Sequence, residues 1–344
     1  MLRLMTCLSL AILSLSSALG DNWPQWRGPT ATGVAPPGAY PAEFSDMENV
    51  AWKTKLPSRA SSTPAVWGDS IFITGCIGLK DGVLCLDRSG RERWRVTFGK
   101  KAKGKHSAAS GANSSPLTDG QRVFVYFKSG TIAALDFAGN VIWEDNLQDR
   151  FGKNTLWWDL GTSPVLAAGN VIVAVMQAGD SFLVALDAAT GEMVWKEPRT
   201  FTCPEESDQS YTTPTVLTQN GHERIFVWGA DHLTAHDAIT GETLWVCDGF
   251  NPDNKEQWRS IASASVWNEI AVVCFGRGRN LCAVDLRDTI EPTKRFLWKR
   301  QGLGADVPTP VTHDGKAYLL EDGGKLYCID IRTGKTLWTS TAPR

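Results

Sequence analysis

The chain has 344 residues, of which 42% are hydrophobic and 21% are charged, and its formal net charge is −2. This balance is typical of a soluble globular protein. The chain lacks the excess of Lys and Arg with which nucleic-acid-binding proteins neutralise phosphates, so we expect no nucleic-acid partner.

Residues 1–20 have the pattern of a secretory signal peptide. Arg3 precedes a short apolar stretch at 4–15, and Ala18 and Gly20 supply the small residues of a cleavage site. The stretch is shorter than the roughly 20 apolar residues of a membrane-spanning helix, so we expect no membrane span. Asp21, not cysteine, would follow the cleavage point. We therefore expect an exported protein, periplasmic or secreted, that carries no lipid anchor.

Residues 21–47 are expected to form an extended N-terminal segment, and the propeller described below is expected to occupy 48–344. The first strand signal is ENVAWKTKL at 48–56, which resembles the last strand of the repeat that follows. Its Trp52 precedes the first repeat, and no earlier strands accompany it. We treat it as an orphan strand.

Six copies of one pattern follow, in which an aspartate, a tight turn and a tryptophan succeed one another. The aspartates recur every 45–51 residues, a period that indicates a radial or stacked repeat. The expected repeats are 61–99, 112–150, 161–199, 211–249, 260–302 and 307–344. Their pattern residues are Asp87 and Trp94; Asp136 and Trp143; Asp187, Gly191 and Trp195; Asp237, Gly241 and Trp245; Asp285 and Trp298; and Asp330, Gly334 and Trp338.

The repeat at 211–249 shows how one unit is expected to fold. Four short strand signals are separated by turn residues, which predicts an antiparallel meander. Asp237 is suited to accept hydrogen bonds from the amides of its own turn, and Gly241 to adopt a positive φ. Trp245 then offers a large apolar surface for packing between neighbouring sheets. A Ser/Thr-Pro step opens five of the six units, where proline is tolerated at the first residue of a strand. Four-stranded sheets at this period predict an all-β fold, the β-propeller.

The eight cysteines leave two structural alternatives. Cys76 and Cys85, and also Cys274 and Cys282, flank hairpin turns, and export would permit disulfides there. Buried free cysteines are the favoured interpretation, because two of the cysteines occupy a repeat position that elsewhere holds a small residue. The members of that position are Cys85, Ala134, Ala185, Ala235 and Cys328. No spacing of histidines and cysteines indicates a metal site.

The aspartate–turn–tryptophan repeat resembles that of the PQQ-binding-like β-propellers, also called the quinoprotein alcohol dehydrogenase-like superfamily. The segment NWPQWRGPTATG at 22–33 is similar to the opening of a secreted bacterial subgroup. The superfamily includes dehydrogenases that hold pyrroloquinoline quinone (PQQ) and a divalent cation over the channel, and non-enzymatic scaffold propellers. This chain lacks the adjacent cysteine pair of the dehydrogenases and is shorter than they are, so the resemblance favours the non-enzymatic subgroup.

The two ends of the array leave the number of blades open. Either the six repeats belong to an incomplete seven- or eight-blade ring, with a gap between the first and sixth blades, or the ring closes with six blades and the Trp52 strand packs elsewhere. The resemblance favours the incomplete ring.

The long connections at 99–113, 150–161, 199–211 and 249–260 all join one blade to the next, so they should gather on one face around the channel mouth. We predict a recognition surface there, formed by Trp157, Trp158, Asp159, Glu205, Glu206, Asp208, Trp258 and Arg259. The alternative is that these tryptophans plug the channel or fix the loops. The basic run at 100–106 is expected to be a solvated loop tip.

These observations predict an extracytoplasmic binding or scaffold protein with no identifiable catalytic site and no cofactor. Its partner would be an unidentified protein or saccharide. One alternative is an oxidoreductase that depends on PQQ and Ca²⁺. Another is a sensor or accessory domain that recognises a saccharide or a peptide.

Overall fold

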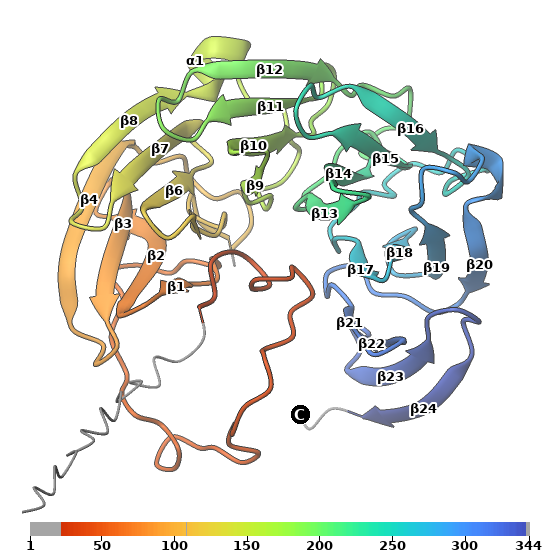
Figure 1. Ribbon diagram of the computed structural model, residues 1–344, viewed down its shortest axis with the longest axis horizontal. Helices are drawn as coiled ribbons and strands as arrows, with labels where there is room; N and C mark the ends of the chain where they lie inside the picture. Colours follow the sequence, from red (N-terminus) through yellow and green to blue (C-terminus); the bar gives the residue numbers. More distant parts are fainter. Residues whose placement is uncertain (1–21, 108, 342–344) are drawn as a thin grey trace, which may run out of the picture.

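The computed structural model describes residues 22–107 and 109–341. It contains six four-stranded antiparallel sheets, each a meander in which strands adjacent in sequence are paired. The sheets are arranged radially, with each first strand near the centre and each fourth strand at the rim (Figure 1). The sequence prediction of an all-β propeller with six four-stranded blades is thus confirmed.

We number the blades in chain order. Blade 1 is β1 (Ala65–Trp67), β2 (Ser70–Ile77), β3 (Lys80–Asp87) and β4 (Glu92–Lys100); blade 2 is β5 (Leu117–Thr118), β6 (Arg122–Tyr126), β7 (Thr131–Asp136) and β8 (Val141–Asn146); blade 3 is β9 (Val165–Ala167), β10 (Asn170–Val175), β11 (Phe182–Asp187) and β12 (Met193–Pro198); blade 4 is β13 (Thr215–Gln219), β14 (His222–Gly229), β15 (His232–Asp237) and β16 (Thr243–Cys247); blade 5 is β17 (Ser265–Trp267), β18 (Ile270–Phe275), β19 (Asn280–Asp285) and β20 (Phe296–Gln301); blade 6 is β21 (Val311–His313), β22 (Lys316–Leu320), β23 (Lys325–Asp330) and β24 (Thr336–Thr341). A short helix, α1 (Leu147–Phe151), follows β8, and a 3-10 turn, η1 (Pro292–Lys294), precedes β20.

Each repeat aspartate fixes the turn between the third and fourth strands. Asp187 Oδ1 accepts hydrogen bonds from the amides of Ala189 (2.9 Å) and Thr190 (2.8 Å), and the backbone hydrogen bond from Thr190 is the largest of the effects that lower the pKa of Asp187. Asp237 makes the same contacts with its own turn. The turn glycine that follows has a positive φ, +75° at Gly191. The local chemistry predicted for the motif is confirmed.

The repeat tryptophan docks on the next blade. The indole N–H of Trp143 donates to the carbonyl of Ala188, the residue after the aspartate of blade 3, at 3.2 Å. Its ring lies against Gly191, where an added Cβ would be 2.6 Å from the ring. The turn glycine is therefore needed both for its backbone conformation and for the space that the preceding blade's tryptophan fills. Trp94, Trp195 and Trp298 dock in the same way on Phe137 and Gly139, Ala238 and Gly241, and Ile331 and Gly334.

The docking of Trp245 differs because the turn of blade 5 is longer. Its N–H donates to the carboxylate of Asp288 at 3.3 Å, and the guanidinium of Arg295 lies 3.7 Å from the centre of its ring. The longer aspartate-to-tryptophan spacing of this repeat thus corresponds to a turn in which Asp288 and Arg295, instead of a glycine, contact the docked tryptophan.

Five hydrophobic clusters fill the spaces between consecutive blades, from the blade 1–blade 2 junction to the blade 5–blade 6 junction. A closed ring of six blades would have a sixth junction. In the described part of the chain, no cluster joins blade 6 to blade 1, and the N-terminal segment lies between β1 and β21 (Figure 1). The predicted gap between the first and sixth blades is present.

The predicted strand at 48–56 is not formed, since only Ser45 and Glu48 make a bridge there. Trp52 nevertheless docks on blade 1 as a repeat tryptophan does. Its indole N–H donates to the carbonyl of Arg88 at 2.7 Å, and an added Cβ on Gly90 would be 2.5 Å from its ring. Without a third strand beside it, the segment has no partner for a β-ladder.

The seven cysteines between residues 22 and 341 are all free. Cys85 and Cys328 are fully buried opposite Trp94 and Trp338, as the small residues are in the other blades, so the favoured prediction is confirmed. Cys7 and the predicted signal peptide lie outside the described residues. Among the described residues no helix is long and apolar enough to span a bilayer.

Candidate functional site at the channel mouth

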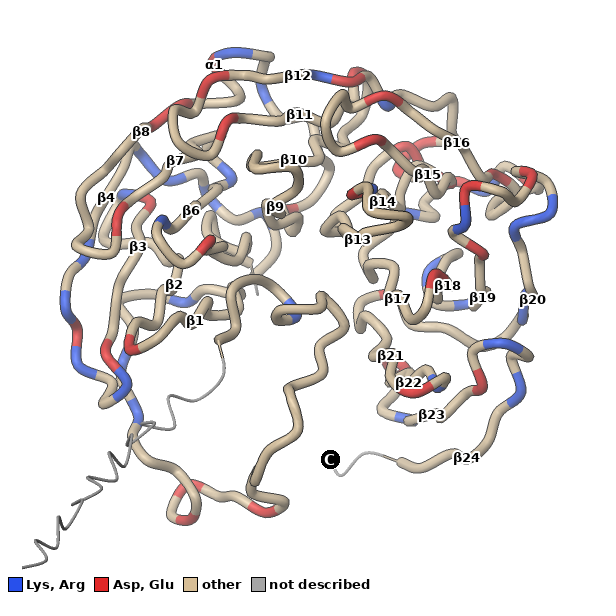
Figure 2. Tube along the Cα trace, viewed as in Figure 1, with Lys and Arg blue, Asp and Glu red and all other residues tan. Residues whose placement is uncertain are grey.

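A cavity of about 650 Å³ opens at the centre of the propeller on the face that carries the long blade-to-blade segments. The segments that lead into the six blades and the N-terminal segment contribute to its wall. Its aromatic members are Trp26, His106, Trp158 and Tyr211, its charged members are Asp159 and Arg259, and its hydroxyl members include Ser115, Ser163, Thr213, Ser263 and Thr309. The first strand of each blade carries no Lys, Arg, Asp or Glu, so the charges lie mainly on the outer strands and connections (Figure 2).

The hydroxyl groups form a relay around the channel. The amide of Ser115 donates to Ser163 Oγ, that of Ser163 to Thr213 Oγ1 and that of Thr213 to Ser263 Oγ, each at 3.0 Å. The relay starts with the amide of Thr63 donating to Ser115 and ends with that of Ser263 donating to Thr309. Each hydroxyl thus satisfies an amide of the preceding blade, which fixes the spacing of neighbouring blades at the channel.

The N-terminal segment enters the channel through Trp26 and Arg27. Trp23 forms an antiparallel bridge with Val66 of β1. The Arg27 guanidinium donates to the carbonyls of Thr309 (3.3 Å) and Pro310, which precede the first strand of blade 6. Burial lowers the pKa of Arg27 to about 10. The segment therefore ties the first blade to the last at the channel and places the indole of Trp26 in the cavity wall.

Trp158 and Arg259 are held by the same carboxylate. The indole N–H of Trp158 donates to Glu206 Oε1 at 2.8 Å, and Arg259 Nη1 donates to the same atom at 3.1 Å. Arg259 also lies 3.5 Å from the carboxylate of Asp306. Two polar atoms of this group, Arg259 Nε and Asp306 Oδ1, are buried without a hydrogen-bond partner in the part of the chain that the structure describes. The Trp158 side chain remains 37% exposed, so its ring is fixed in orientation and still accessible.

Asp159 anchors the neighbouring loop from within the wall. Its carboxylate accepts the amides of Lys105 (2.9 Å) and His106 (2.8 Å) and pairs with the Lys128 ammonium. Desolvation alone would raise the pKa of Asp159, but the hydrogen bonds from His106, Lys128 and Lys105 together lower it. The ammonium of Lys105 donates to the carbonyl of Leu156 at 2.5 Å. Lys105 and His106 remain exposed, as predicted for a solvated loop tip, although their hydrogen bonds fix the position of the loop.

The structure brings together only part of the predicted recognition surface. Trp158, Asp159 and Arg259 line the cavity, and Glu206 supports two of them from behind. Trp157 and Glu205 are exposed outside the cavity, Asp208 is half-buried, and Trp258 packs beneath Lys255. The alternative that the tryptophans fix loops holds in part for Trp158, which does so through its N–H while its ring faces the cavity.

Several cavity residues were not singled out from the sequence. Trp26 lies in a motif that indicated only family resemblance, and Tyr211 directly precedes the Thr212-Thr213-Pro214 marker. The hydroxyl residues before the prolines were noted only as strand openings. Their recurrence at the same repeat position was the signal that could have identified them.

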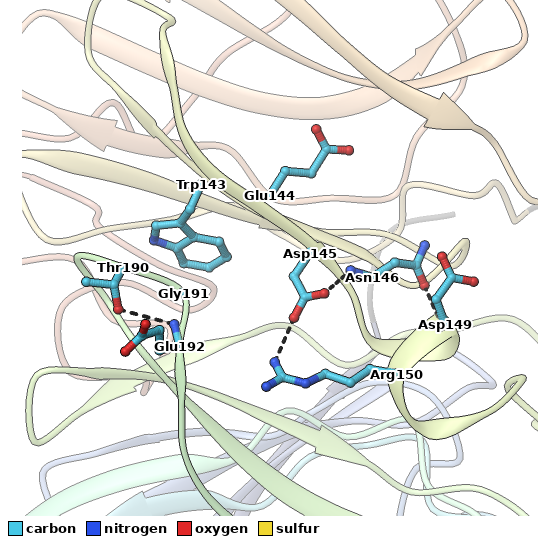
Figure 3. Close-up of a pocket in the computed structure, with 9 residues that line it drawn as sticks. All are labelled: Trp143, Glu144, Asp145, Asn146, Asp149, Arg150, Thr190, Gly191 and Glu192. Carbon is cyan, nitrogen blue, oxygen red and sulfur yellow. Dashed lines mark hydrogen bonds and ion pairs between the residues drawn. The ribbon is translucent and has the colours of Figure 1, made fainter.

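A second, outer groove lies between β8, α1 and the turn of blade 3 (Figure 3). Arg150 and Asp145 form a 2.8 Å ion pair in its wall, and the docked indole of Trp143 also lines it. It follows from the way neighbouring blades pack at the rim, and we do not consider it a functional site.

Between residues 22 and 341 no three His, Cys, Asp or Glu side chains are placed to hold a metal ion. Asp159 is paired with Lys128, and Glu206 with Arg259, so the two carboxylates nearest the cavity already have cationic partners.

Tryptophan docking, four-stranded blades and a wide central cavity define a β-propeller of the tryptophan-docking class. The chain belongs to the PQQ-like repeat family, because a family model described as outer membrane protein assembly factor BamB matches residues 47–202, 128–290 and 289–344.

Similar proteins divide between outer membrane protein assembly factors and dehydrogenases. The chain is 24% identical to a polyvinylalcohol dehydrogenase of Sphingopyxis sp. (strain 113P3), over 83% of this chain and 54% of that protein. It is 23% identical to the outer membrane protein assembly factor BamB of Bordetella pertussis, over 84% of this chain and 67% of that protein. The chain thus spans only about half the length of the polyvinylalcohol dehydrogenase.

Among solved structures, a quinohemoprotein alcohol dehydrogenase from Comamonas testosteroni has a TM-score of 0.68 at 14% identity, covering 96% of this chain and 68% of that one. BamB from Moraxella catarrhalis has a TM-score of 0.56 at 18% identity, covering 83% and 76%. These two likenesses show the fold and do not select a function.

Proposed function

We propose that this protein is an exported, non-enzymatic binding propeller that receives a protein partner at the channel mouth. The observation that carries the proposal is the accessible ring of Trp158 beside the Arg259 guanidinium. The ring is held in place by Glu206, and Arg259 Nε is buried without a hydrogen-bond acceptor among the described residues. A rigid aromatic ring next to an incompletely satisfied guanidinium is typical of the few residues that dominate binding energy at interfaces.

The arrangement of charges supports binding over catalysis. The carboxylates at the mouth position other groups, since Asp159 holds the 105–106 loop and Glu206 holds Trp158 and Arg259. The likeness to BamB, whose name describes an assembly factor, supports a scaffold role. The likeness to polyvinylalcohol dehydrogenase supports the rival proposal, a quinone-dependent oxidoreductase.

Capture of partners from envelope extracts tests the proposal. The wild-type protein is compared with Trp158→Ala and with the control Ile239→Ala, whose side chain is exposed at the outer turn of blade 4. We expect a partner that is retained by the wild type and the control, and whose affinity falls at least about tenfold with Trp158→Ala, as for an interface hot spot. Thermal unfolding checks that both variants are folded.

Equal capture by all three proteins would contradict the proposed site. A second experiment, in which PQQ and Ca²⁺ are added to the purified protein, tests the rival proposal. Tight retention of the quinone together with dye reduction by alcohols would favour the oxidoreductase and overturn the non-enzymatic proposal.

A further inference from the structure

Residues 22–33 form a floor beneath the cavity at the channel mouth. The segment pairs with β1 and lies alongside β9 and β13, and the carbonyl of Pro24 accepts the amide of Thr118 in β5 at 2.8 Å. Arg27 donates to Ser265 Oγ in β17 at 3.5 Å and to a carbonyl next to β21. In each blade the contact lies just past the relay hydroxyl along the chain, so the segment crosses the channel below the hydroxyl relay.

The relay hydroxyls that line the cavity have hydrogens without an acceptor. Each oxygen accepts a backbone amide, and a Ser or Thr hydroxyl can donate its own hydrogen in addition. In the part of the chain that the structure describes, these hydroxyls donate no hydrogen bond. They belong to Ser115, Ser163, Thr213, Ser263 and Thr309. Thr212 provides the contrast, because its hydroxyl donates to the carbonyl of Trp228 at 2.6 Å.

Burial and polarisation make these hydroxyls good donors to a ligand. A hydroxyl oxygen that accepts an amide hydrogen is polarised and becomes a stronger donor, above all away from bulk water. Ser163 is 3% exposed and Thr213 is 6% exposed, and both line the cavity. A cation is disfavoured there, since each hydroxyl oxygen already accepts an amide hydrogen. The relay therefore presents a ring of donors that suits an anion.

Arg27 adds a buried positive charge to the floor. Its guanidinium donates to carbonyl oxygens and to one hydroxyl, and among the described residues it forms no ion pair. Burial lowers the pKa of Arg27 to about 10, which leaves the group protonated at neutral pH. The carboxylates that line the cavity or contact Arg259 do not compensate this charge, because each has a cationic partner of its own. These pairs are Asp159 with Lys128, Glu206 with Arg259, and Asp306 with Arg277.

We propose that the cavity binds a carboxylate, which accepts hydrogen bonds from the relay hydroxyls above the Arg27 guanidinium. A carboxylate has two oxygens that each accept more than one hydrogen bond, and its single negative charge matches that of Arg27. The apolar remainder of the ligand packs against Trp26 and Tyr211 in the cavity wall.

This inference goes beyond the function proposed for the channel mouth, because it does not use the contact between Trp158 and Glu206. The carboxylate belongs either to a small molecule or to an acidic side chain or carboxyl terminus of a protein. The same donors serve both sources, which the experiment below separates.

Calorimetric titration with benzoate, in dilute buffer without chloride, tests the site. Benzamide is the matched probe, because it has nearly the same shape and no charge. We expect benzoate to bind saturably, and benzamide to bind at least about tenfold more weakly, since hydrogen bonds to a charged acceptor are stronger than those to a neutral one.

Substitutions of the floor cation test the role assigned to Arg27. Arg27→Gln should lower the affinity for benzoate at least about tenfold, and Arg27→Lys, which keeps the charge, should retain more of it. The control is Arg300→Gln at the rim. Arg300 also forms no ion pair among the described residues, and it donates to the carbonyl of Gly334 and the hydroxyl of Thr336. Its loss should leave the affinity unchanged.

A second pair of variants leaves the floor intact. Thr213→Val removes one donor of the relay, and Thr212→Val removes the adjacent buried hydroxyl, whose hydrogen is already bound to Trp228. Only Thr213→Val should weaken benzoate binding. Thermal unfolding without ligand establishes that each variant is folded.

Two peptides separate the sources of the carboxylate. One is an acetylated trialanine with a free carboxyl terminus, and the other is a blocked peptide whose only carboxylate is an aspartate side chain. Tighter binding of either peptide than of acetate would assign the carboxylate to a polypeptide. Binding of acetate and benzoate without binding of the peptides would assign it to a small molecule.

Three results would overturn the proposal. The first is that none of the four carboxylate probes binds, and the second is that benzamide binds as tightly as benzoate. The third is benzoate binding that neither Arg27→Gln nor Thr213→Val weakens. Since Trp158 is unaltered in all of these proteins, failure here is distinguishable from failure of partner capture at the mouth.

Discussion

At the scale of single residues, the propeller buries a carboxyl group whose neighbours offset only part of the cost of its desolvation. Asp81 at the β2–β3 hairpin is fully buried, and within residues 22–107 and 109–341 neither carboxylate oxygen has a hydrogen-bond partner that meets the usual geometry. Desolvation raises the pKa of Asp81 to about 6, against the opposing effects of Ser129 and Lys101. Such a group is held most favourably when it is protonated.

We predict that Asp81 makes the protein less stable as the pH rises. The folded-state pKa lies above the ordinary value of 3.8, so the native state binds the proton more tightly than the unfolded state does. The free energy of unfolding should therefore fall as pH rises from about 4 to above 6. Asp81→Asn removes the ionisation and should raise the free energy of unfolding by about 1–3 kcal/mol at pH 8, with little change at pH 4.

Denaturant unfolding at the two pH values measures this effect. Glu43→Gln is the control, because it removes a carboxylate from an exposed position in the N-terminal segment. A gain from Asp81→Asn that is equal at pH 4 and pH 8 would show that the carboxyl group does not titrate in the native state as expected.

At the scale of the blade, the sequence predicts what is local and misses what lies one repeat away. Asp187 and Gly191 could be assigned because both act within a turn of a few residues. The acceptor of the Ser163 amide, Thr213 Oγ1, lies in the next blade and depends on how the blades pack. The Ser/Thr-Pro steps could be recognised in the sequence. The role of the hydroxyl before each proline could not be predicted, because it depends on how neighbouring blades are placed.

We predict that Ser163→Ala destabilises the protein more than Thr63→Ala does. Ser163 Oγ accepts the buried amide of Ser115 at 3.0 Å, and its loss would leave that amide without a partner. An unsatisfied buried donor costs about 1–3 kcal/mol. Thr63 holds the same position in blade 1, but its hydroxyl receives no amide from a preceding blade within the described chain.

The comparison is made by denaturant unfolding of both variants under one set of conditions. Because the two substitutions remove similar hydroxyls from matching positions, their difference isolates the relay hydrogen bond. Equal losses of stability would mean that the relay adds nothing beyond the packing of the hydroxyl-bearing side chains.

At the scale of the whole molecule, counting repeats left an open and a closed ring as alternatives, and the family resemblance favoured the open one. Trp52 was recognised as a seventh tryptophan, and the structure docks it on Gly90, although without the predicted strand. The composition of the channel mouth was less accessible to prediction. Trp26 reaches the cavity because its segment crosses from Val66 to Pro310, a path that no local pattern in 22–33 specifies.

An open array should not unfold as a closed ring does. When each blade contacts only its neighbours, stability is approximately the sum of the blade and junction terms, and a terminal blade has one junction instead of two. Blade 1 is partly compensated by the contacts of Trp52 and Ser58. Blade 6 has no such cover on its tryptophan face, so it should open most readily.

We therefore predict that amide hydrogens of β24 exchange at least about tenfold faster than those of β12, its counterpart in blade 3. The two strands hold the same position in their sheets and both pair along one edge only, so edge effects cancel. They differ in that Trp195 is docked on blade 4 and Trp338 is exposed. Exchange followed by mass spectrometry at neutral pH provides the measurement, and similar protection of the two strands would indicate that blade 6 is covered in solution as blade 3 is.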